Sequence, residues 1–225
     1  MSEEDHQQKQ SATEKPSLRA KLFGAYREYV LEHGNRPASV YKFCKDNGIE
    51  EQQFYEAFAS LDALEGEIWA QLIRETRDTV EADEDYRGYP VRQKVLAFHY
   101  TLLEYASQQR SFMLERFPGL KPGCRSLRRM ENVFADYAEN WIDEGTENGE
   151  IAKRRNVTSW YPQAFTLVML FVLDHWLKDE SERFERTDAL IEKGVTLVFD
   201  LIRTQALDSA FDLLRFFGGR DHDDK

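Results

Sequence analysis

Two short helical patterns joined by a tight turn occupy residues 39–58, in the stretches SVYKFCKDNGI (39–49) and FYEAF (54–58). Gly48 stands between the two patterns, where a glycine permits the backbone reversal that joins two short helices. Ile49 and Phe54 are placed to fill the core that these helices share, and Phe58 is placed to pack them against a preceding helix. The stretch therefore predicts a helix-turn-helix supported by further helices.

Apolar residues recur at three- and four-residue spacing on both sides of this stretch, and no period-two segment of useful length is present, so the predicted fold class is all-α. Ser60 and Asp62 supply the start signal of a longer helix after the turn. We expect about nine helices, which cover residues 18–33, 37–47, 51–58, a segment from 60 to about 80, 91–117, 126–144 and 160–178, with two more within 187–217.

The chain is predicted to contain two folded domains, because the helices before residue 73 are short and those after it are long. Residues 17–73 form the helix-turn-helix domain, and residues 74–217 form a larger helical domain. Residues 1–16 are expected to be a disordered tail, and residues 218–225 a short polar tail.

Composition indicates a globular protein with a strongly charged surface. The 225 residues are 41% hydrophobic and 32% charged, with a net charge of −11 and a mean hydropathy of −0.65. A field of this sign repels polyanions, so nucleic-acid binding would need a local basic patch. The start of the chain has no apolar core, and the longest apolar run, 164–173, is half of the roughly 20 residues that a bilayer span needs. We therefore expect a cytoplasmic protein.

No pattern typical of catalysis or metal binding is present. Cys44 and Cys124 lack metal-ligand spacing and are interpreted as reduced thiols. The sequence contains no nucleophile motif, glycine-rich phosphate loop or HExxH helix. We expect neither an enzyme nor a bound cofactor or metal.

Residues 18–69 resemble the amino-terminal domain of the TetR family of transcriptional regulators, in which a long helix is followed by a helix-turn-helix and a connecting helix. Residues 39–49 stand where that family has its second helix and turn, and residues 54–58 stand where it has its aromatic recognition-helix signature. The segment 60–64, Ser-Leu-Asp-Ala-Leu, matches the start of the connecting helix. The resemblance implies that residues 74–217 form a ligand-binding and dimerisation domain.

The resemblance also implies DNA binding through the helix-turn-helix, with Gln52 and Gln53 suited to adenine edges. The full set of expected DNA contacts is Ser39, Tyr41, Lys42, Lys45, Gln52, Gln53 and Tyr55. However, residues 36–65 contain three basic and six acidic side chains, a local net charge of −3, where phosphate neutralisation usually supplies much of the affinity. Ala57 and Leu61 replace a polar residue and a phosphate-binding lysine of the family.

Two hypotheses of function follow. The first is a ligand-responsive, homodimeric transcriptional regulator that binds DNA and a small apolar ligand. The second is a TetR-like accessory or adaptor protein, whose helix-turn-helix does not bind DNA and whose larger domain binds a lipid or isoprenoid.

Large aromatic rings are unusually frequent in the helices between residues 91 and 178, which predicts a lined apolar pocket with a few polar groups. The expected lining residues are Phe98, His99, Tyr105, Phe112, Phe134, Tyr137, Trp141, Phe165 and His175. Arg125, Arg128 and Arg129 begin a helix nearby in the sequence. We interpret them as a solvated basic face, with a phosphate-bearing partner as the alternative.

A wide apolar stripe on the last helices predicts a homodimer, because the resemblance implies that these helices pair with those of a second subunit in a four-helix bundle. The residues expected at the dimer interface are Leu190, Val195, Val198, Phe199, Ile202, Phe211 and Leu214.

Overall fold

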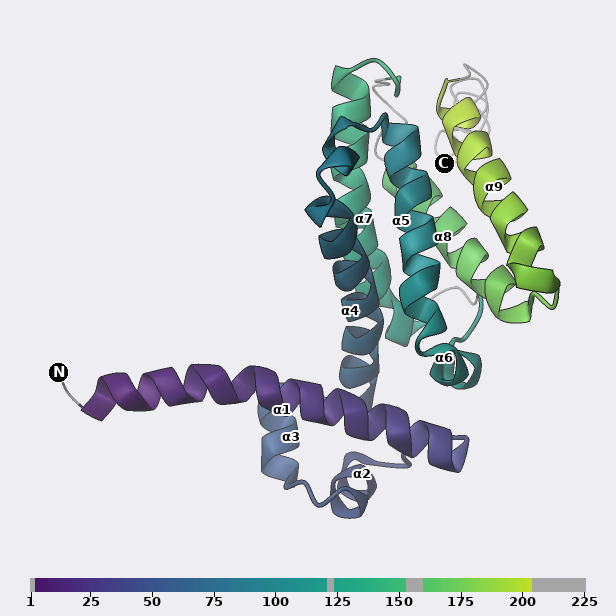
Figure 1. The fold of residues 1–225 in the computed structure, drawn as a ribbon. Helices are drawn as coiled ribbons and strands as arrows, with labels where there is room; N and C mark the ends of the chain where they lie inside the picture. The colour runs from purple at the N-terminus through teal and green to yellow at the C-terminus, as the bar shows by residue number, and fades with distance from the viewer. Residues whose placement is uncertain (1–2, 121–123, 153–159, 204–225) are drawn as a thin grey trace, which may run out of the picture. The chain divides into compact units, whose positions relative to one another are not determined.

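The structure is a computed structural model that describes residues 3–120, 124–152 and 160–203. Within these ranges the chain forms nine α-helices and two short 3₁₀ helices and contains no β-strand, which confirms the predicted all-α class (Figure 1). The helices are α1 (Glu3–His33), α2 (Val40–Asp46), α3 (Glu51–Ala57), α4 (Leu61–Ala82), α5 (Val91–Ser107), α6 (Arg110–Arg116), α7 (Arg125–Glu147), α8 (Tyr161–Lys178) and α9 (Glu185–Arg203).

Helix α1 begins earlier than the sequence predicts. Its backbone is helical from Glu3 rather than from Leu18, inside the segment predicted as a disordered tail. That segment lacks the apolar residues on which the prediction depended. It does contain glutamate, glutamine, lysine and alanine, which favour helix in the absence of packing.

The predicted helix over 91–117 is divided into α5 and α6. The chain leaves the helical conformation at Gln109, whose φ and ψ are −129° and 27°. The run 107–111, Ser-Gln-Gln-Arg-Ser, offers no apolar residue that would hold a continuous helix against the core.

Helix α7 continues beyond its predicted end at residue 144 as far as Glu147. Gly145 is required there, because a Cβ atom on it would lie 2.7 Å from the side chain of Ile151. The amide of Ile151 donates a hydrogen bond to the Gly145 carbonyl at 2.7 Å, so the chain folds back against the helix end. The turn itself follows at Gly149, which has a φ of +81°.

The internal contacts of the chain define two compact units. Unit 1 comprises residues 1–72 and 106–130, and unit 2 comprises residues 73–105 and 131–225. One division falls inside α4, after Leu72. Residues 106–130, which include α6 and the start of α7, belong to the same unit as the helix-turn-helix.

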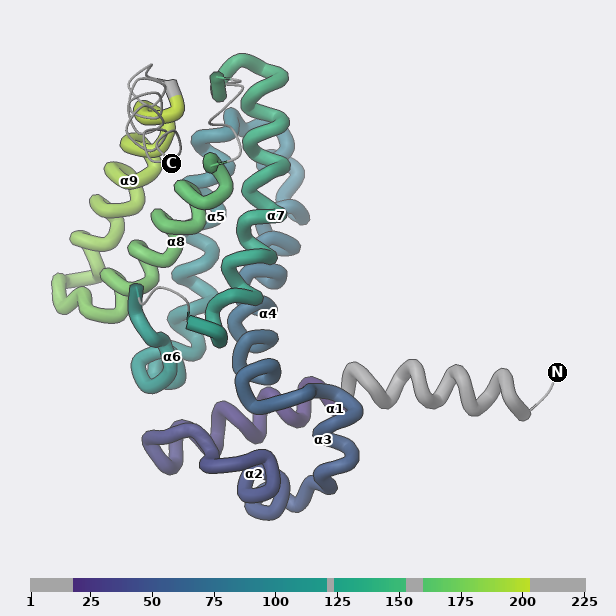
Figure 2. Tube along the Cα trace, turned by 180° about the vertical axis from the view of Figure 1, so that it is seen from behind, coloured from purple at the N-terminus to yellow at the C-terminus, as the bar shows by residue number. Residues whose placement is uncertain are grey.

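Unit 1 contains the helix-turn-helix that residues 39–58 predict. Gly48 adopts the left-handed conformation, with a φ of +62°, between α2 and α3. The rings of Phe43 and Phe54 meet at 5.9 Å across the two helices. Phe23 of α1 contacts Phe58 at the end of α3 at 5.6 Å, and Tyr26 of α1 contacts Phe43 of α2 at 6.0 Å. Both short helices are therefore anchored on α1, beside which they lie in Figure 2.

A buried carboxylate joins three helices of unit 1. Glu65 of α4 is 1% exposed, and it accepts a hydrogen bond from the Tyr26 hydroxyl of α1 at 2.5 Å. Arg116 of α6 donates to both carboxylate oxygens, with its closest contact at 2.9 Å. Burial, together with the neighbouring Glu65 charge, raises the pKa of Tyr26, so this hydroxyl stays protonated and donates.

Unit 2 is a helical bundle whose core is aromatic. Phe98 of α5 contacts Phe134 of α7 at 5.3 Å, Trp141 of α7 contacts Phe165 of α8 at 6.1 Å, and Phe165 contacts Phe199 of α9 at 5.8 Å. Helices α8 and α9 pack along one another (Figures 1 and 2).

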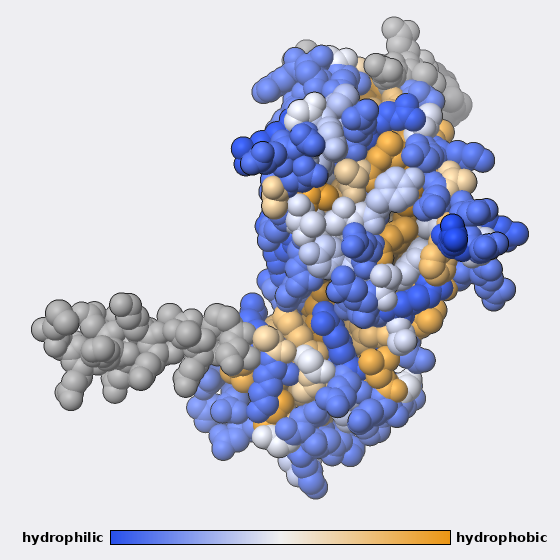
Figure 3. Space-filling model, viewed as in Figure 1, coloured by the Kyte–Doolittle hydropathy of each residue, from blue (hydrophilic) through white to orange (hydrophobic). Residues whose placement is uncertain are grey.

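Most of the visible surface is hydrophilic, and hydrophobic residues reach it in separate patches (Figure 3). Among the described helices, none is both long and apolar enough to cross a membrane.

Replacement of the arginine that pairs with Glu65 tests the role of this ion pair. Arg116→Ala would leave a buried carboxylate without its cation, so the free energy of unfolding is expected to fall by about 3–5 kcal/mol. Lys178→Ala is the control, because Lys178 forms an exposed pair with Asp174 that is worth less than about 1 kcal/mol. Urea denaturation followed by circular dichroism measures both. Equal losses of unfolding free energy in the two variants would contradict the expectation that the buried pair stabilises the fold more than the exposed pair.

Candidate functional site

The side chains predicted to contact DNA lie on the exposed faces of α2 and α3. The Ser39 hydroxyl accepts a hydrogen bond from the Lys42 amide at 3.1 Å, so it caps α2 as well as facing solvent. Tyr41 and Tyr55 are 59% and 53% exposed, which is unusual for large aromatic side chains. Lys42, Lys45, Gln52 and Gln53 are exposed too. The structure therefore presents all seven predicted residues to solvent.

Ion pairs neutralise most of the basic groups on this face. Lys42 pairs with Asp46 at 2.7 Å, and Arg36 pairs with Asp62 at 2.6 Å. Lys45 forms no ion pair with any described residue and lies 5.9 Å from the centre of the Tyr41 ring. Lys45 is therefore the lysine of α2 whose charge is available to a phosphate.

Most rings predicted to line a pocket instead fill the core of unit 2. Phe98, Phe134, Tyr137 and Trp141 contact one another with centroid separations between 4.8 and 5.8 Å. Separations of this size are those of rings in direct contact. The abundance of aromatic residues that suggested a cavity is thus explained largely by packing.

Two of the predicted pocket residues lie elsewhere. Phe112 belongs to unit 1, where its ring contacts Trp69 at 5.4 Å. Its sequence spacing placed it on the same long helix as Phe98, but that helix ends at Ser107. Tyr105 is half-buried and shares a hydrogen bond with the Thr79 hydroxyl at 2.7 Å.

Both predicted histidines have a buried nitrogen without a hydrogen-bond partner among the described residues, namely Nε2 of His99 and of His175. His99 is fully buried, and its Nδ1 lies 2.7 Å from the Val95 carbonyl, which makes Nδ1 the donor. Burial lowers the pKa of His99 to about 4, against a partial opposing effect of that hydrogen bond. The imidazole is therefore neutral at physiological pH.

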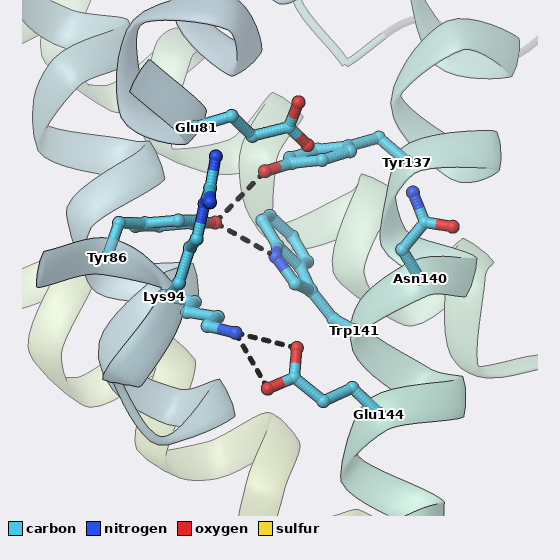
Figure 4. Close-up of a pocket in the computed structure, with 8 residues that line it drawn as sticks. Glu81, Tyr86, Lys94, Tyr137, Asn140, Trp141 and Glu144 are labelled. Carbon is cyan, nitrogen blue, oxygen red and sulfur yellow. Dashed lines mark hydrogen bonds and ion pairs between the residues drawn. The ribbon is translucent and has the colours of Figure 1, made fainter. Parts of the chain in front are cut away.

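A cavity of about 400 Å³ lies beside the aromatic core of unit 2 (Figure 4). Its lining residues are Glu81, Tyr86, Arg87, Lys94, Tyr137, Asn140, Trp141 and Glu144. Trp141 Nε1 donates to the Tyr86 hydroxyl at 3.2 Å, and that hydroxyl lies 3.0 Å from the hydroxyl of Tyr137. These bonds orient three aromatic side chains around one face of the cavity.

Charged side chains line the cavity next to these rings (Figure 4). Lys94 donates to both carboxylate oxygens of Glu144 at 2.7 Å, and its ammonium lies 5.6 Å from the centre of the Tyr86 ring. Arg87 is exposed and forms no ion pair with any described residue. Burial, Tyr86 and Glu81 raise the pKa of Tyr137, so its hydroxyl remains protonated.

This cavity can hold an amphipathic molecule, because aromatic faces and charged side chains of both signs line one space, and Arg87 among them forms no ion pair with a described residue. Tyr137 and Trp141 are the members of the predicted pocket that line it. Tyr86 and Lys94 also line it and were not among the predicted pocket residues, because no spacing pattern in the sequence connects residues 86 and 94 with α7. Among the described residues, no group of three potential ligands is placed to hold a metal ion.

The predicted dimer interface needs correction. Val195, Val198, Phe199 and Ile202 of α9 are buried within the chain itself, and the ring of Phe199 contacts Phe165 of α8 at 5.8 Å. Leu190 is half-buried at a surface groove, and Phe211 and Leu214 lie outside the described residues.

The groove lies between α8 and α9 and has a volume of about 340 Å³. It is almost wholly apolar, with Leu167, Phe171 and Leu197 among its lining residues. Leu167 and Leu197 are 61% and 58% exposed. A Cβ atom on Gly194 would lie 3.3 Å from Val168, so this glycine permits the close approach of the two helices that form the groove.

An all-α chain with an amino-terminal helix-turn-helix and a helical bundle is the class of protein that these observations define. A family model described as the tetracyclin repressor-like, C-terminal domain matches residues 94–217, more than half of the chain. The chain therefore belongs to the TetR family of transcriptional regulators. No curated protein compared with the sequence matches it.

Solved structures share the fold at low sequence identity. The chain is similar to a TetR-family regulator of Syntrophomonas wolfei, at 14% identity over 84% of this chain and 96% of that chain, with a TM-score of 0.61. The fatty acid degradation regulator FadR of Bacillus halodurans matches at 14% identity over 80% and 94%, with a TM-score of 0.58. FadR of Bacillus subtilis, solved in complex with stearoyl-CoA, matches at 16% identity over 80% and 97%, with a TM-score of 0.53.

The neutral, buried His99 gives a testable pH dependence. Its folded pKa of about 4 lies below the ordinary value of 6.5. As the pH falls between these values, the unfolded chain binds a proton that the folded chain does not, so stability is lost by up to about 1.4 kcal/mol per pH unit. In urea titrations at pH 7, 6 and 5, we expect the free energy of unfolding of His99→Leu to fall less steeply with decreasing pH than that of the wild type. Parallel pH profiles would show that His99 does not carry this dependence.

Proposed function

We propose that this protein is a ligand-responsive, homodimeric transcriptional regulator that binds DNA through α2 and α3. The observation that carries the proposal is the helix-turn-helix, whose exposed residues include two tyrosines, two glutamines and the unpaired Lys45. Tyrosine and lysine at these positions would contact the DNA backbone, and Gln52 and Gln53 would meet base edges. We expect the protein to act in the cytoplasm and to catalyse no reaction.

The ligand is proposed to occupy the cavity beside Tyr86, Tyr137 and Trp141. Three aromatic side chains suit the apolar part of a lipid-like molecule, and Arg87 suits a negatively charged end. The stearoyl-CoA complex of the Bacillus subtilis FadR, which shares the fold, makes a fatty acyl thioester a reasonable first ligand to test.

Helix α4 offers a route by which this ligand would influence DNA binding. Glu81, near the end of α4, lines the cavity, whereas Glu65 of the same helix holds Tyr26 and Arg116 in unit 1. A ligand that binds better to one position of Glu81 would favour the corresponding position of α4. In the dimer, such a change would alter the separation of the two recognition helices.

The α8–α9 groove is proposed as the surface that binds a second copy of the chain. Exposed Leu167, Phe171 and Leu197 would be covered there, and Lys193 is the charged residue among those that line the groove. Contiguous apolar surface of this kind marks interaction sites on otherwise hydrophilic proteins. Leu190 keeps its predicted place in the interface.

The second candidate function is that of a lipid- or isoprenoid-binding adaptor that does not bind DNA. The ion pairs of Lys42 with Asp46 and of Arg36 with Asp62 favour it, because each phosphate contact would have to replace an internal partner. The two functions differ in one measurable property, namely affinity for duplex DNA.

A fluorescence-anisotropy titration with duplex DNA at low salt tests the regulator function. We expect micromolar or tighter binding to promoter DNA from the encoding locus, with a shallow salt dependence, because few phosphates are neutralised. Lys45→Ala should weaken binding severalfold and reduce the salt slope by about 1, whereas Lys178→Ala on α8 should leave it unchanged.

Stearoyl-CoA added to the complex is expected to lower the DNA affinity of the wild type. A wild-type protein that fails to bind even random duplex DNA at micromolar concentration would exclude the regulator. In that case, retained stearoyl-CoA binding would support the adaptor.

A charge placed in the α8–α9 groove tests the dimer. The wild type is expected to sediment at twice the 26.4 kDa chain mass, and Leu197→Glu is expected to sediment as a monomer, because dimerisation would bury the new carboxylate. Leu114→Glu is the matched control, since Leu114 of α6 is similarly exposed and is not one of the residues that line the groove. A wild-type monomer at micromolar concentration, or loss of the dimer in the control alone, would refute this interface.

A further inference from the structure

Unit 1 contains a second cavity, of about 440 Å³, that the proposed regulator does not use. Three arginines line it and come from three separate segments of the chain. Arg36 follows α1, Arg116 ends α6, and Arg125 begins α7. Guanidinium groups that converge from separate segments on one space are typical of sites for phosphates and carboxylates.

Two of the acidic side chains in the wall are already engaged by the protein. Asp62 accepts from Arg36 at 2.6 Å, and both oxygens of the buried Glu65 accept from Arg116. In each pair the guanidinium has more N–H groups than the carboxylate uses. Arg116 Nη1, and Nε and Nη2 of Arg36, form no hydrogen bond within the part of the chain that the structure describes.

Arg125 has no internal counter-charge. It is exposed and forms no ion pair with a described residue. It also begins α7, whose first turn contains no acidic residue, at the helix end where positive charge is unfavourable. The third acidic residue of the wall, Glu115, is exposed. Arg125 therefore gains most from an anion inside the cavity.

We propose that this cavity binds the phosphate group of a small phosphorylated metabolite. The phosphate would accept hydrogen bonds from the free N–H groups of Arg116 and Arg36 and from Arg125, and the Ser126 hydroxyl beside them is a further donor. Three oxygens on one phosphorus match donors that converge from several directions. The site is separate from the cavity beside Tyr86, and its occupation requires neither DNA nor an apolar ligand.

A solvated basic face does not account for the whole arrangement of arginines at the start of α7. Arg128 is exposed and unpaired among the described residues, as expected of such a face. Arg129 forms an ion pair with Glu67. Arg125 is the member of the three that lines the cavity, so the three arginines have different roles and make a matched comparison.

Calorimetric titration of the full chain with inorganic phosphate and with glycerol 3-phosphate, at constant ionic strength, tests the site. We expect both anions to bind the wild type. Arg125→Ala should weaken binding by about tenfold, the effect of one charge-assisted hydrogen bond. Arg128→Ala removes the same charge from the same helix without touching the cavity and should change the affinity by less than about twofold.

The absence of binding to the wild type at millimolar phosphate would overturn the proposal, as would equal losses in the two variants. Vesicles that contain phosphatidic acid distinguish the source of the phosphate. Vesicle binding that depends on Arg125 would support the site and assign the phosphate to a lipid headgroup. Loss of duplex DNA affinity in Arg125→Ala alone would instead make Arg125 a DNA contact and overturn the proposal. Phosphate binding that depends on Arg125 can be observed even if the protein binds no DNA. Failure of the regulator function is therefore distinguishable from failure of this site.

Discussion

A buried carboxylate in an otherwise apolar interior must be compensated by hydrogen bonds and opposite charge, and Glu65 imposes this condition on unit 1. The compensation comes from two other helices, through Tyr26 of α1 and Arg116 of α6. If α6 left α4, Glu65 would remain as a buried charge without its cation, and if α1 left, the carboxylate would lose the hydrogen bond from Tyr26. The helix-turn-helix depends on the same arrangement, because Phe58 anchors α3 on Phe23 of α1 and Phe43 anchors α2 on Tyr26 of α1. One acidic side chain thus holds together the unit that contains the helix-turn-helix.

Residues close in the sequence were predicted well, and residues brought together from a distance were not. The turn at Gly48 and the ring pair of Phe43 and Phe54 follow from local spacing alone, and the structure contains both. By contrast, no local pattern indicates that α6 belongs with the helix-turn-helix or that Phe112 contacts Trp69. The abundance of aromatic residues suggested a cavity because a sequence does not reveal how closely rings contact each other. The cavity of unit 2 is lined by Lys94 and Glu144, which neutralise each other only once α5 and α7 are side by side.

The helix-turn-helix and the cavity of unit 2 each contain one basic side chain, Lys45 and Arg87, that forms no ion pair with a described residue. DNA binding favours free basic groups, yet Lys42 and Arg36 are paired with acids and leave Lys45 as the accessible cation of α2. In the cavity, the paired Lys94 leaves Arg87 as the free cation, beside aromatic faces. A protein with these charges would bind DNA weakly. A ligand with a modest preference for one position of α4 would then be enough to release the DNA. The internal pairs that favour an adaptor are thus also compatible with a sensitive regulator.

Helix α9 has apolar residues on two sides. Val195, Val198 and Ile202 complete the core of their own chain, whereas Leu197 and Leu201 remain exposed. If α9 had a single apolar face, the same residues would be needed for the core and for association. A chain that used them for association could fold only as an oligomer. With two faces, a substitution at Leu197 would leave the monomer's interior intact and would alter only association through the exposed face. Substitutions at the exposed residues of α9 would therefore change which chain could bind this surface with little effect on the fold. Related chains could in this way form separate assemblies that do not mix.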